Sequence, residues 1–308
     1  MRHESAQKRW HRKLNRMRLG VIFPQTEIGN DPVAIKDYAQ AAEQLGYNHL
    51  LVYDHVLGAH ADRFKETRFR PPYNHETPFH EPFVLFGYLA SATEGLELVT
   101  GILILPQRQT ALVAKQAAAV DVLSGGRLRL GVGIGWNFTE YEALGEDFSN
   151  RGRRAEEQIG LLRKLWTNEL VDFDGKYHSL SQVGINPLPV QRPIPIWMGA
   201  MADAAVQRAA RIADGWFPQF GPNADGETAI ERFRGYIRDA GRDPDDVGVA
   251  GRISLGRGSD EDRGSLLESW KQLHASHVSF NTMGASLASP QDHIDAISDF
   301  KKLADTVI

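Results

Sequence analysis

Residues 111–137 read ALVAKQAAAVDVLSGGRLRLGVGIGWN, and they are the most informative part of the chain about its fold because they hold one complete helix, turn and strand. Its first half predicts an amphipathic helix, since apolar side chains recur at spacings of three and four: Val113, Ala117, Val120 and Leu123. Gly125 and Gly126 end that helix, because glycine readily adopts the left-handed conformation found after a helix end. Residues 127–132 then have the Leu and Val content of a strand buried under helices.

The same alternation extends outward in both directions from this unit. Further short apolar runs predict strands at residues 18–23, 49–53, 96–105, 194–198, 216–218, 247–253 and 278–280. Amphipathic segments between them predict helices near residues 35–45, 82–93, 151–166, 205–212, 230–240 and 266–273, and a last helix that begins at Pro290 behind the cap Ser289. Eight strands that alternate with helices predict an α/β fold, a (β/α)₈ TIM-like barrel formed by residues 17–308 as a single domain.

Two insertions interrupt this regular pattern. Residues 56–81 form a long loop rich in Arg, Pro, His and aromatic residues, and a loop of this length in a compact domain usually covers a site or is mobile. Residues 167–193 form an irregular insertion, with a small hairpin expected around Asp174 and Gly175.

Composition bounds the class of protein. The 308 residues include no cysteine, and 42% are apolar and 24% charged, so we expect a cytoplasmic globular protein without disulfides. No run approaches the ~20 apolar residues of a membrane helix, and a net charge of −4 gives no reason to expect nucleic acid as a partner.

The first sixteen residues differ in composition from the rest. Six basic residues against Glu4 give this segment a charge of +5, which leaves −9 for the remainder of the chain. It lacks the apolar core of a signal peptide, so we expect residues 1–16 to be a disordered extension or an over-long start. A functional basic arm is the alternative.

In a barrel of this kind, the active site lies at the C-terminal ends of the strands. Asp54 and His55 follow the second predicted strand and are the acid–imidazole pair among the strand ends. Histidine is the side chain best able to exchange a proton near neutral pH, so we predict His55 as the catalytic residue and Asp54 as a neighbour that contacts a bound ring. In the alternative interpretation, Asp54 caps a turn and His55 is merely exposed.

Two glycine-containing turns follow other strands. Gly133 to Asn137 allow close approach of backbone amides to a ligand, with a Trp and an Asn beside them. Gly199, Ala200 and Met201 lead into a helix N-terminus, which favours an anion such as phosphate. Each signal is weak by itself, because many such turns bind nothing.

The long loop and its borders also contain several histidines, which raises a metal site as an alternative: His55, His60, His75 and His80. Their spacings match no helical metal-binding pair and no cysteine assists, so we predict no metal ligands.

Several segments together resemble the luciferase-like monooxygenase superfamily, and most closely its branch that depends on coenzyme F420, an 8-hydroxy-5-deazaflavin. They occur in this order: residues 19–24 (LGVIFP), 52–55 (VYDH), 98–105 (LVTGILIL), 118–137 (AAVDVLSGGRLRLGVGIGWN), 151–166 (RGRRAEEQIGLLRKLW) and 195–216 (PIWMGAMADAAVQRAARIADGW). The resemblance implies a TIM-like barrel that holds a flavin or deazaflavin at the C-terminal ends of its strands.

The resemblance also implies roles for individual residues. The tricyclic ring would be lined by Thr100, Gly101 and Ile102, with a cis peptide bond between the last two, and flanked by Gly135, Trp136 and Asn137. The amides of Gly199, Ala200 and Met201 would bind the phosphate. His55 matches a histidine that serves as an active-site acid in the sugar-phosphate dehydrogenase branch. Trp136 stands where that branch has a glutamate, which argues against a sugar phosphate as substrate, and Glu140 is a weaker substitute.

The function implied is an F420-dependent oxidoreductase that transfers a hydride to or from a small or medium organic substrate. An FMN-dependent monooxygenase, a catalytically silent cofactor-binding protein and a metal hydrolase are the alternatives. We expect a homodimer, and a separate reductase that supplies reduced cofactor. Cationic loop residues would attract an acidic substrate or the oligoglutamate tail of F420, unless they are simply solvated: Arg63, Lys65, Arg68 and Arg70.

Overall fold

The computed structural model describes residues 17–66 and 70–308. The strands are β1 (Arg18–Ile22), β2 (His49–Val52), β3 (Glu97–Thr100), β4 (Leu103–Ile104), β5 (Leu128–Gly133), β6 (Val171–Asp174), β7 (Ser179–Val183), β8 (Ile196–Gly199), β9 (Gly215–Phe217), β10 (Gly248–Ser254) and β11 (His277–Asn281). The helices are α2 (Pro32–Gln44), α3 (Pro82–Ala92), α4 (Thr110–Leu123), α5 (Phe138–Ala143), α6 (Arg151–Thr167), α7 (Asp203–Ile212), α8 (Ala224–Asp239), α9 (Asp260–Gln272) and α10 (Pro290–Ala304). The expected extension, residues 1–16, and Arg68 lie outside the described residues.

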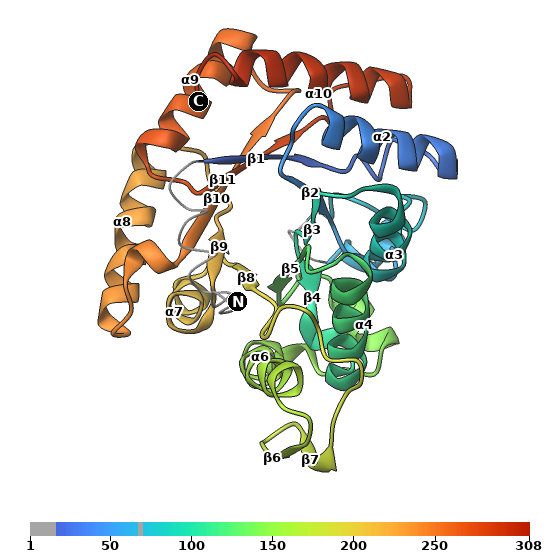
Figure 1. The fold of residues 1–308 in the computed structure, drawn as a ribbon, viewed down its shortest axis with the longest axis vertical. Helices are drawn as coiled ribbons and strands as arrows, with labels where there is room; N and C mark the ends of the chain where they lie inside the picture. The colour runs from blue at the N-terminus through green and yellow to red at the C-terminus, as the bar shows by residue number, and fades with distance from the viewer. Residues whose placement is uncertain (1–16, 67–69) are drawn as a thin grey trace, which may run out of the picture.

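A closed parallel barrel forms the centre of the molecule. Its strands follow the order β3-β2-β1-β11-β10-β9-β8-β5-β4, and β3 also pairs with β5, which closes the ring. Both β3 and β4 pair with β5, so they are two parts of one barrel strand, and the described residues give eight strand positions. Helices surround the strands on the outside (Figure 1). The predicted (β/α)₈ barrel is confirmed.

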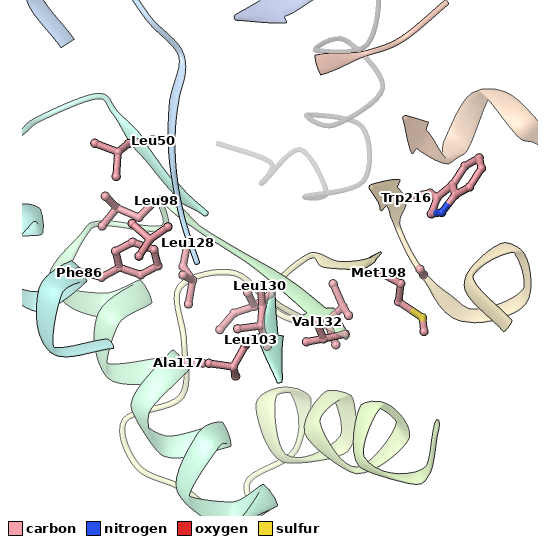
Figure 2. Close-up of a cluster of buried hydrophobic side chains, with 14 of the residues drawn as sticks. Leu50, Phe86, Leu98, Leu103, Ala117, Leu128, Leu130, Val132, Met198 and Trp216 are labelled. Carbon is pink, nitrogen blue, oxygen red and sulfur yellow. The ribbon is translucent and has the colours of Figure 1, made fainter. Parts of the chain in front are cut away.

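The two faces of β5 show how alternation builds the barrel wall. Leu128, Leu130 and Val132 lie in the same buried cluster as Phe86 of α3 and Ala117 of α4 (Figure 2). Each fully buried Leu or Val contributes about 1.5–3 kcal/mol, so this layer holds the surrounding helices on the strand.

The residue between Leu128 and Leu130 points to the opposite face of the strand, toward the barrel interior. Arg129 is fully buried, donates a hydrogen bond of 3.0 Å to Glu97, and places its guanidinium 4.5 Å from the ring centroid of Trp197. Trp197 belongs to a second apolar cluster with Ile22 and Leu51. Because side chains alternate along a strand, Arg129 faces the barrel interior, which combines apolar and charged groups.

The prediction of one continuous strand over residues 96–105 is wrong. The chain forms β3 and β4, and Gly101 and Ile102 interrupt the pairing between them. The run LVTGILIL is apolar throughout, so periodicity alone could not show where hydrogen bonding to the neighbouring strand stops.

Two other local predictions are confirmed, the turn after α4 and the hairpin, whereas the predicted start of α9 is wrong. Gly125 has a φ of 68° immediately beyond α4, and the hairpin around Asp174 forms from β6 and β7. Helix α9 begins at Asp260, earlier than predicted, because Ser259 and Asp262 form a capping box. Helix α5 was not predicted.

Within the described residues, no helix has both the length and the apolar character needed to cross a membrane.

Candidate active site

The segments that follow the strands gather at one edge of the barrel, since all its strands are parallel. The Ile102 side chain lies where three of these segments meet: the break between β3 and β4 and the ends of β5 and β8. A Cβ on Gly133 would lie 2.3 Å from Ile102 Cδ1, and a Cβ on Gly199 would lie 3.0 Å from Ile102 Cγ2. The two glycines therefore make room for this isoleucine, which brings the ends of β5 and β8 against the break in the third barrel strand.

The backbone at this break is held from both sides. Thr100 is buried and its hydroxyl donates a hydrogen bond of 2.6 Å to the carbonyl of Gly131. A Cβ on Gly101 would lie 2.2 Å from Leu51 Cδ2, so any other residue there would displace the buried Leu51 side chain. The peptide bond between Gly101 and Ile102 is cis, as the resemblance predicted.

Asp54, which follows β2, lies next to this break and is 1% exposed. One of its carboxylate oxygens accepts a hydrogen bond of 3.0 Å from the amide of Ile104, and the other accepts one of 2.7 Å from Arg108. Arg108 also donates to Glu81 at 3.0 Å. Both oxygens are engaged within the protein, so Asp54 acts on the site through the positions of Ile104 and Arg108.

His55 lies beside a buried carboxylate, that of Glu140 on α5. Glu140 Oε1 accepts hydrogen bonds from the amides of Val56 at 2.7 Å and Leu57 at 3.1 Å. Its Oε2 is 3.5 Å from His55 Nδ1. The sequence offered Glu140 only as a weaker substitute, and the structure brings it to the imidazole from 85 residues away.

A sequence signal for this contact existed. Asn137 caps α5 by accepting from the amide of Thr139, and Glu140 follows the cap by three residues, which is the spacing of a capping box. This spacing predicts a short helix directly after β5. The Glu140 side chain then binds the amides of the long loop instead of the cap itself.

Tyr73 of the long loop, which the sequence did not single out, reaches the same imidazole. Its hydroxyl contacts His55 Nδ1, and the two ring centroids are 3.8 Å apart. Asn137 Nδ2 lies 3.5 Å from the Tyr73 hydroxyl oxygen. Burial, with the negative charge of Glu140, raises the pKa of Tyr73 well above its ordinary value, so the phenol keeps its proton. We call His55, Tyr73, Asn137 and Glu140 the His55 network.

Aromatic rings of the long loop pack around this network. The centroid of Phe79 is 4.8 Å from that of His55, and Trp136 lies 6.1 Å from His55 and 5.1 Å from Tyr73. Phe64 is 5.8 Å from Trp136. The loop therefore packs against the candidate site, and Trp136, predicted to flank a ring, is half-buried among its side chains.

The predicted phosphate-binding segment leads into α7. Ala202 is the N-cap of this helix, and among the described side chains none caps its first turn. The Met201 side chain is 80% exposed, and the Ala200 carbonyl accepts a hydrogen bond of 2.9 Å from Trp216. The segment thus offers mainly backbone amides, which suits an anion at the helix N-terminus.

Two of the four loop cations predicted to attract an anion form ion pairs with acidic residues. Arg63 binds Glu142 at 2.5 Å and Lys65 binds Asp62 at 2.7 Å, so neither of these predicted anion-attracting cations lacks an acidic partner. Over residues 17–66 and 70–308, no group of three or more His, Asp and Glu is arranged to hold a metal ion.

Comparison with known proteins gives matches along most of the chain. The family model described as luciferase-like monooxygenase matches residues 17–305. An uncharacterized protein of Mycobacterium tuberculosis is 37% identical over 224 residues, which cover 71% of this chain and 77% of that one. The FMNH₂-dependent dimethylsulfone monooxygenase of Pseudomonas putida is 33% identical over 58% of this chain and 46% of its own length.

Relatives that use the deazaflavin are also found. The F420-dependent glucose-6-phosphate dehydrogenase of Nakamurella multipartita is 29% identical over 75% of this chain and 66% of its own length. Among solved structures, an F420-dependent secondary alcohol dehydrogenase in complex with an F420-acetone adduct has a TM-score of 0.75 at 18% identity, covering 94% of this chain and 99% of that one. At this identity the structural likeness supports the fold alone.

Proposed function

Because the chain belongs to the luciferase-like monooxygenase family, it is a flavin- or deazaflavin-dependent oxidoreductase, and we propose that its cofactor is coenzyme F420. The proposed reaction is hydride transfer between F420 and a small or medium organic substrate. The observation that carries this proposal is the His55 network, which places a proton-exchanging imidazole 6.1 Å from Trp136 at the site edge of the barrel.

The residues present fit such a cofactor in two respects. The first turn of α7 has amides that no described side chain caps, which suits a phosphate group. Ile102 lies half-exposed against Gly133 and Gly199, and offers an apolar surface for a flat ring. The Gly135-Trp136-Asn137 ending also resembles the F420 branch more than the FMN branch.

When bound, F420 supplies or accepts the hydride, and the protein contributes binding, orientation and proton handling. Hydride transfer to or from a carbon bound to oxygen or nitrogen changes the basicity of that heteroatom, so a general acid or base must exchange a proton with it. His55 is the group placed to do so. Tyr73 holds the imidazole through Nδ1 beside the carboxylate of Glu140, and the aromatic rings of the loop shield it from water.

An FMN-dependent monooxygenase is the second candidate. Sequence identity to the dimethylsulfone monooxygenase of Pseudomonas putida, 33% over 183 residues, favours it. In that case the enzyme would consume oxygen when reduced FMN is supplied. A non-catalytic cofactor-binding protein is the third candidate.

Parallel titration of the purified protein with F420 and with FMN, followed by fluorescence, tests the cofactor. We expect saturable F420 binding and weaker FMN binding. Both molecules carry a phosphate, so the difference reports recognition of the ring and tail. Tighter binding of FMN, with oxygen consumption on addition of reduced FMN, refutes the proposal in favour of the monooxygenase.

The variant His55→Asn separates catalysis from binding. We expect it to bind F420 within about twofold of the unmodified chain while hydride transfer falls about 10²-fold, since a general acid or base contributes 10²–10⁴-fold. Screening of alcohols, imines and activated alkenes supplies the substrate for this comparison. Equal turnover by the variant would show that His55 takes no part in the chemistry.

We also propose that the chain works as a homodimer and that a separate reductase supplies the reduced coenzyme. Sedimentation equilibrium tests the homodimer. An assay for F420 reduction with a nicotinamide donor tests the need for a reductase, and we expect the protein alone to give no reduction. A monomer at micromolar concentration would refute the dimer.

A further inference from the structure

We infer that Tyr73 is a positioning residue that holds neutral His55 in the tautomer with its proton on Nε2, so that His55 presents a proton donor to the substrate. The role toward substrate rests on the proposed function. The tautomer itself is a property of the chain without cofactor, and can be measured separately.

The two ring nitrogens of His55 have different surroundings. Nδ1 contacts the Tyr73 hydroxyl and lies 3.5 Å from Glu140 Oε2. No described residue forms a hydrogen bond with Nε2, and the His55 side chain retains 14% exposure. The protein therefore fixes the imidazole through Nδ1 and leaves Nε2 for a ligand.

The direction of the hydrogen bond to Nδ1 follows from the partners of Tyr73. The Asn137 amide is oriented because its Oδ1 accepts from Thr139, from the backbone amide at 3.2 Å and the hydroxyl at 2.6 Å. Its Nδ2 therefore carries the two donors, which go to the Leu57 carbonyl at 3.3 Å and to the Tyr73 hydroxyl oxygen at 3.5 Å. The hydroxyl proton of Tyr73 is then available for His55 Nδ1, its close acceptor.

A nitrogen that accepts a hydrogen bond carries no proton. Neutral histidine has one proton on its two nitrogens, so a Tyr73 hydroxyl donating to Nδ1 leaves the proton on Nε2. Burial keeps the phenol protonated, as its raised pKa indicates, and so keeps it a donor. The result is a chain of donors that runs from Asn137 through Tyr73 to His55.

Glu140 opposes this arrangement and makes the inference testable. A carboxylate only accepts hydrogen bonds, so Glu140 favours a proton on Nδ1, whereas Tyr73 favours a proton on Nε2. The hydroxyl contacts Nδ1 more closely than the carboxylate does. Removal of the hydroxyl should therefore transfer the proton to Nδ1 and leave Nε2 as an acceptor.

The test compares Tyr73→Phe with Tyr88→Phe by nitrogen NMR of histidine-labelled protein, without cofactor, at about pH 8.5, which lies above the ordinary titration range of histidine. Tyr88→Phe is the matched control, because it removes a hydroxyl bound to the Pro32 carbonyl on the outer helices. His55→Asn assigns the signals. We expect a proton on Nε2 in the unmodified chain and in Tyr88→Phe, and on Nδ1 in Tyr73→Phe.

A proton on Nδ1 in the unmodified chain, or an unchanged tautomer in Tyr73→Phe, overturns the inference. A purely structural role for Tyr73 would lower thermal stability without moving the tautomer. Once a substrate is known, Tyr73→Phe should lower kcat about 10-fold or more with KM nearly unchanged, since a general acid contributes 10²–10⁴-fold. If F420 does not bind, the tautomer result still stands and only the proposed function fails.

Discussion

Replacement of Glu140 by glutamine should loosen the start of the long loop. Glu140 is fully buried, and one of its carboxylate oxygens accepts hydrogen bonds from the amides of Val56 at 2.7 Å and Leu57 at 3.1 Å. Glutamine keeps the size of the side chain and one acceptor oxygen but removes the negative charge. The variant Glu140→Gln thus tests the charge of the acceptor and not its shape.

The magnitude follows from the two hydrogen bonds. A hydrogen bond to a charged group contributes about 1.5–3 kcal/mol and a neutral one about 0.5–1.5 kcal/mol, so each bond weakens by about 1 kcal/mol. Two bonds give about 2 kcal/mol, which corresponds to about a 30-fold change in the local opening equilibrium. Amide hydrogen exchange at Val56 and Leu57 should accelerate by this factor.

Hydrogen exchange with mass spectrometry over residues 50–60 measures this effect directly. The control is Glu142→Gln on the same helix, which removes an exposed carboxylate paired with Arg63 at 2.5 Å. Exposed pairs contribute about 0–1 kcal/mol, so this variant should change exchange less than about fivefold. If the Glu140 variant exchanges no faster than the Glu142 variant, Glu140 does not hold the loop.

Two further substitutions test buried titratable groups, one after β2 and one at its start. Asp54→Asn weakens the buried pair with Arg108 and should cost about 3 kcal/mol, a fall in Tm of about 5 °C by calorimetry; an unchanged Tm contradicts the pairing at 2.7 Å. Burial lowers the pKa of His49, which lies 2.8 Å from Ser279 inside the barrel, so only the unfolded chain takes up a proton as pH falls below about 6.5. The free energy of unfolding, measured with urea, should therefore fall between about pH 7.5 and 5.5 by about 1.4 kcal/mol more in the unmodified chain than in His49→Gln. Equal losses in both would refute this.

Local signals predicted most of the elements. The spacing of Val113, Ala117 and Val120 and the glycines that follow predict α4 and its end, and the apolar run after them predicts β5. These signals work because a helix face, a cap and a strand each depend on neighbouring residues. The order of strands and helices then predicts the barrel, since few other topologies accommodate it.

The break in the third strand shows where local signals stop. Gly101 and Ile102 interrupt an apolar run that looks continuous, and the resemblance predicted the cis bond that periodicity could not. The packing of Ile102 against Gly133 and Gly199 requires three chain segments at once. Residue preferences within one segment carry no information about such a contact.

Sequence patterns were sufficient to predict the barrel and the strand ends at which a site can form, including His55. The folding of distant segments together decided the partners of that histidine: Glu140 comes from 85 residues away and Tyr73 from 18 residues away across an irregular loop. It also decided that Asp54 faces Arg108, 54 residues further along. The physical reason is that helices and strands follow from interactions between near neighbours, whereas these contacts depend on the paths of loops, which packing against the closed barrel determines.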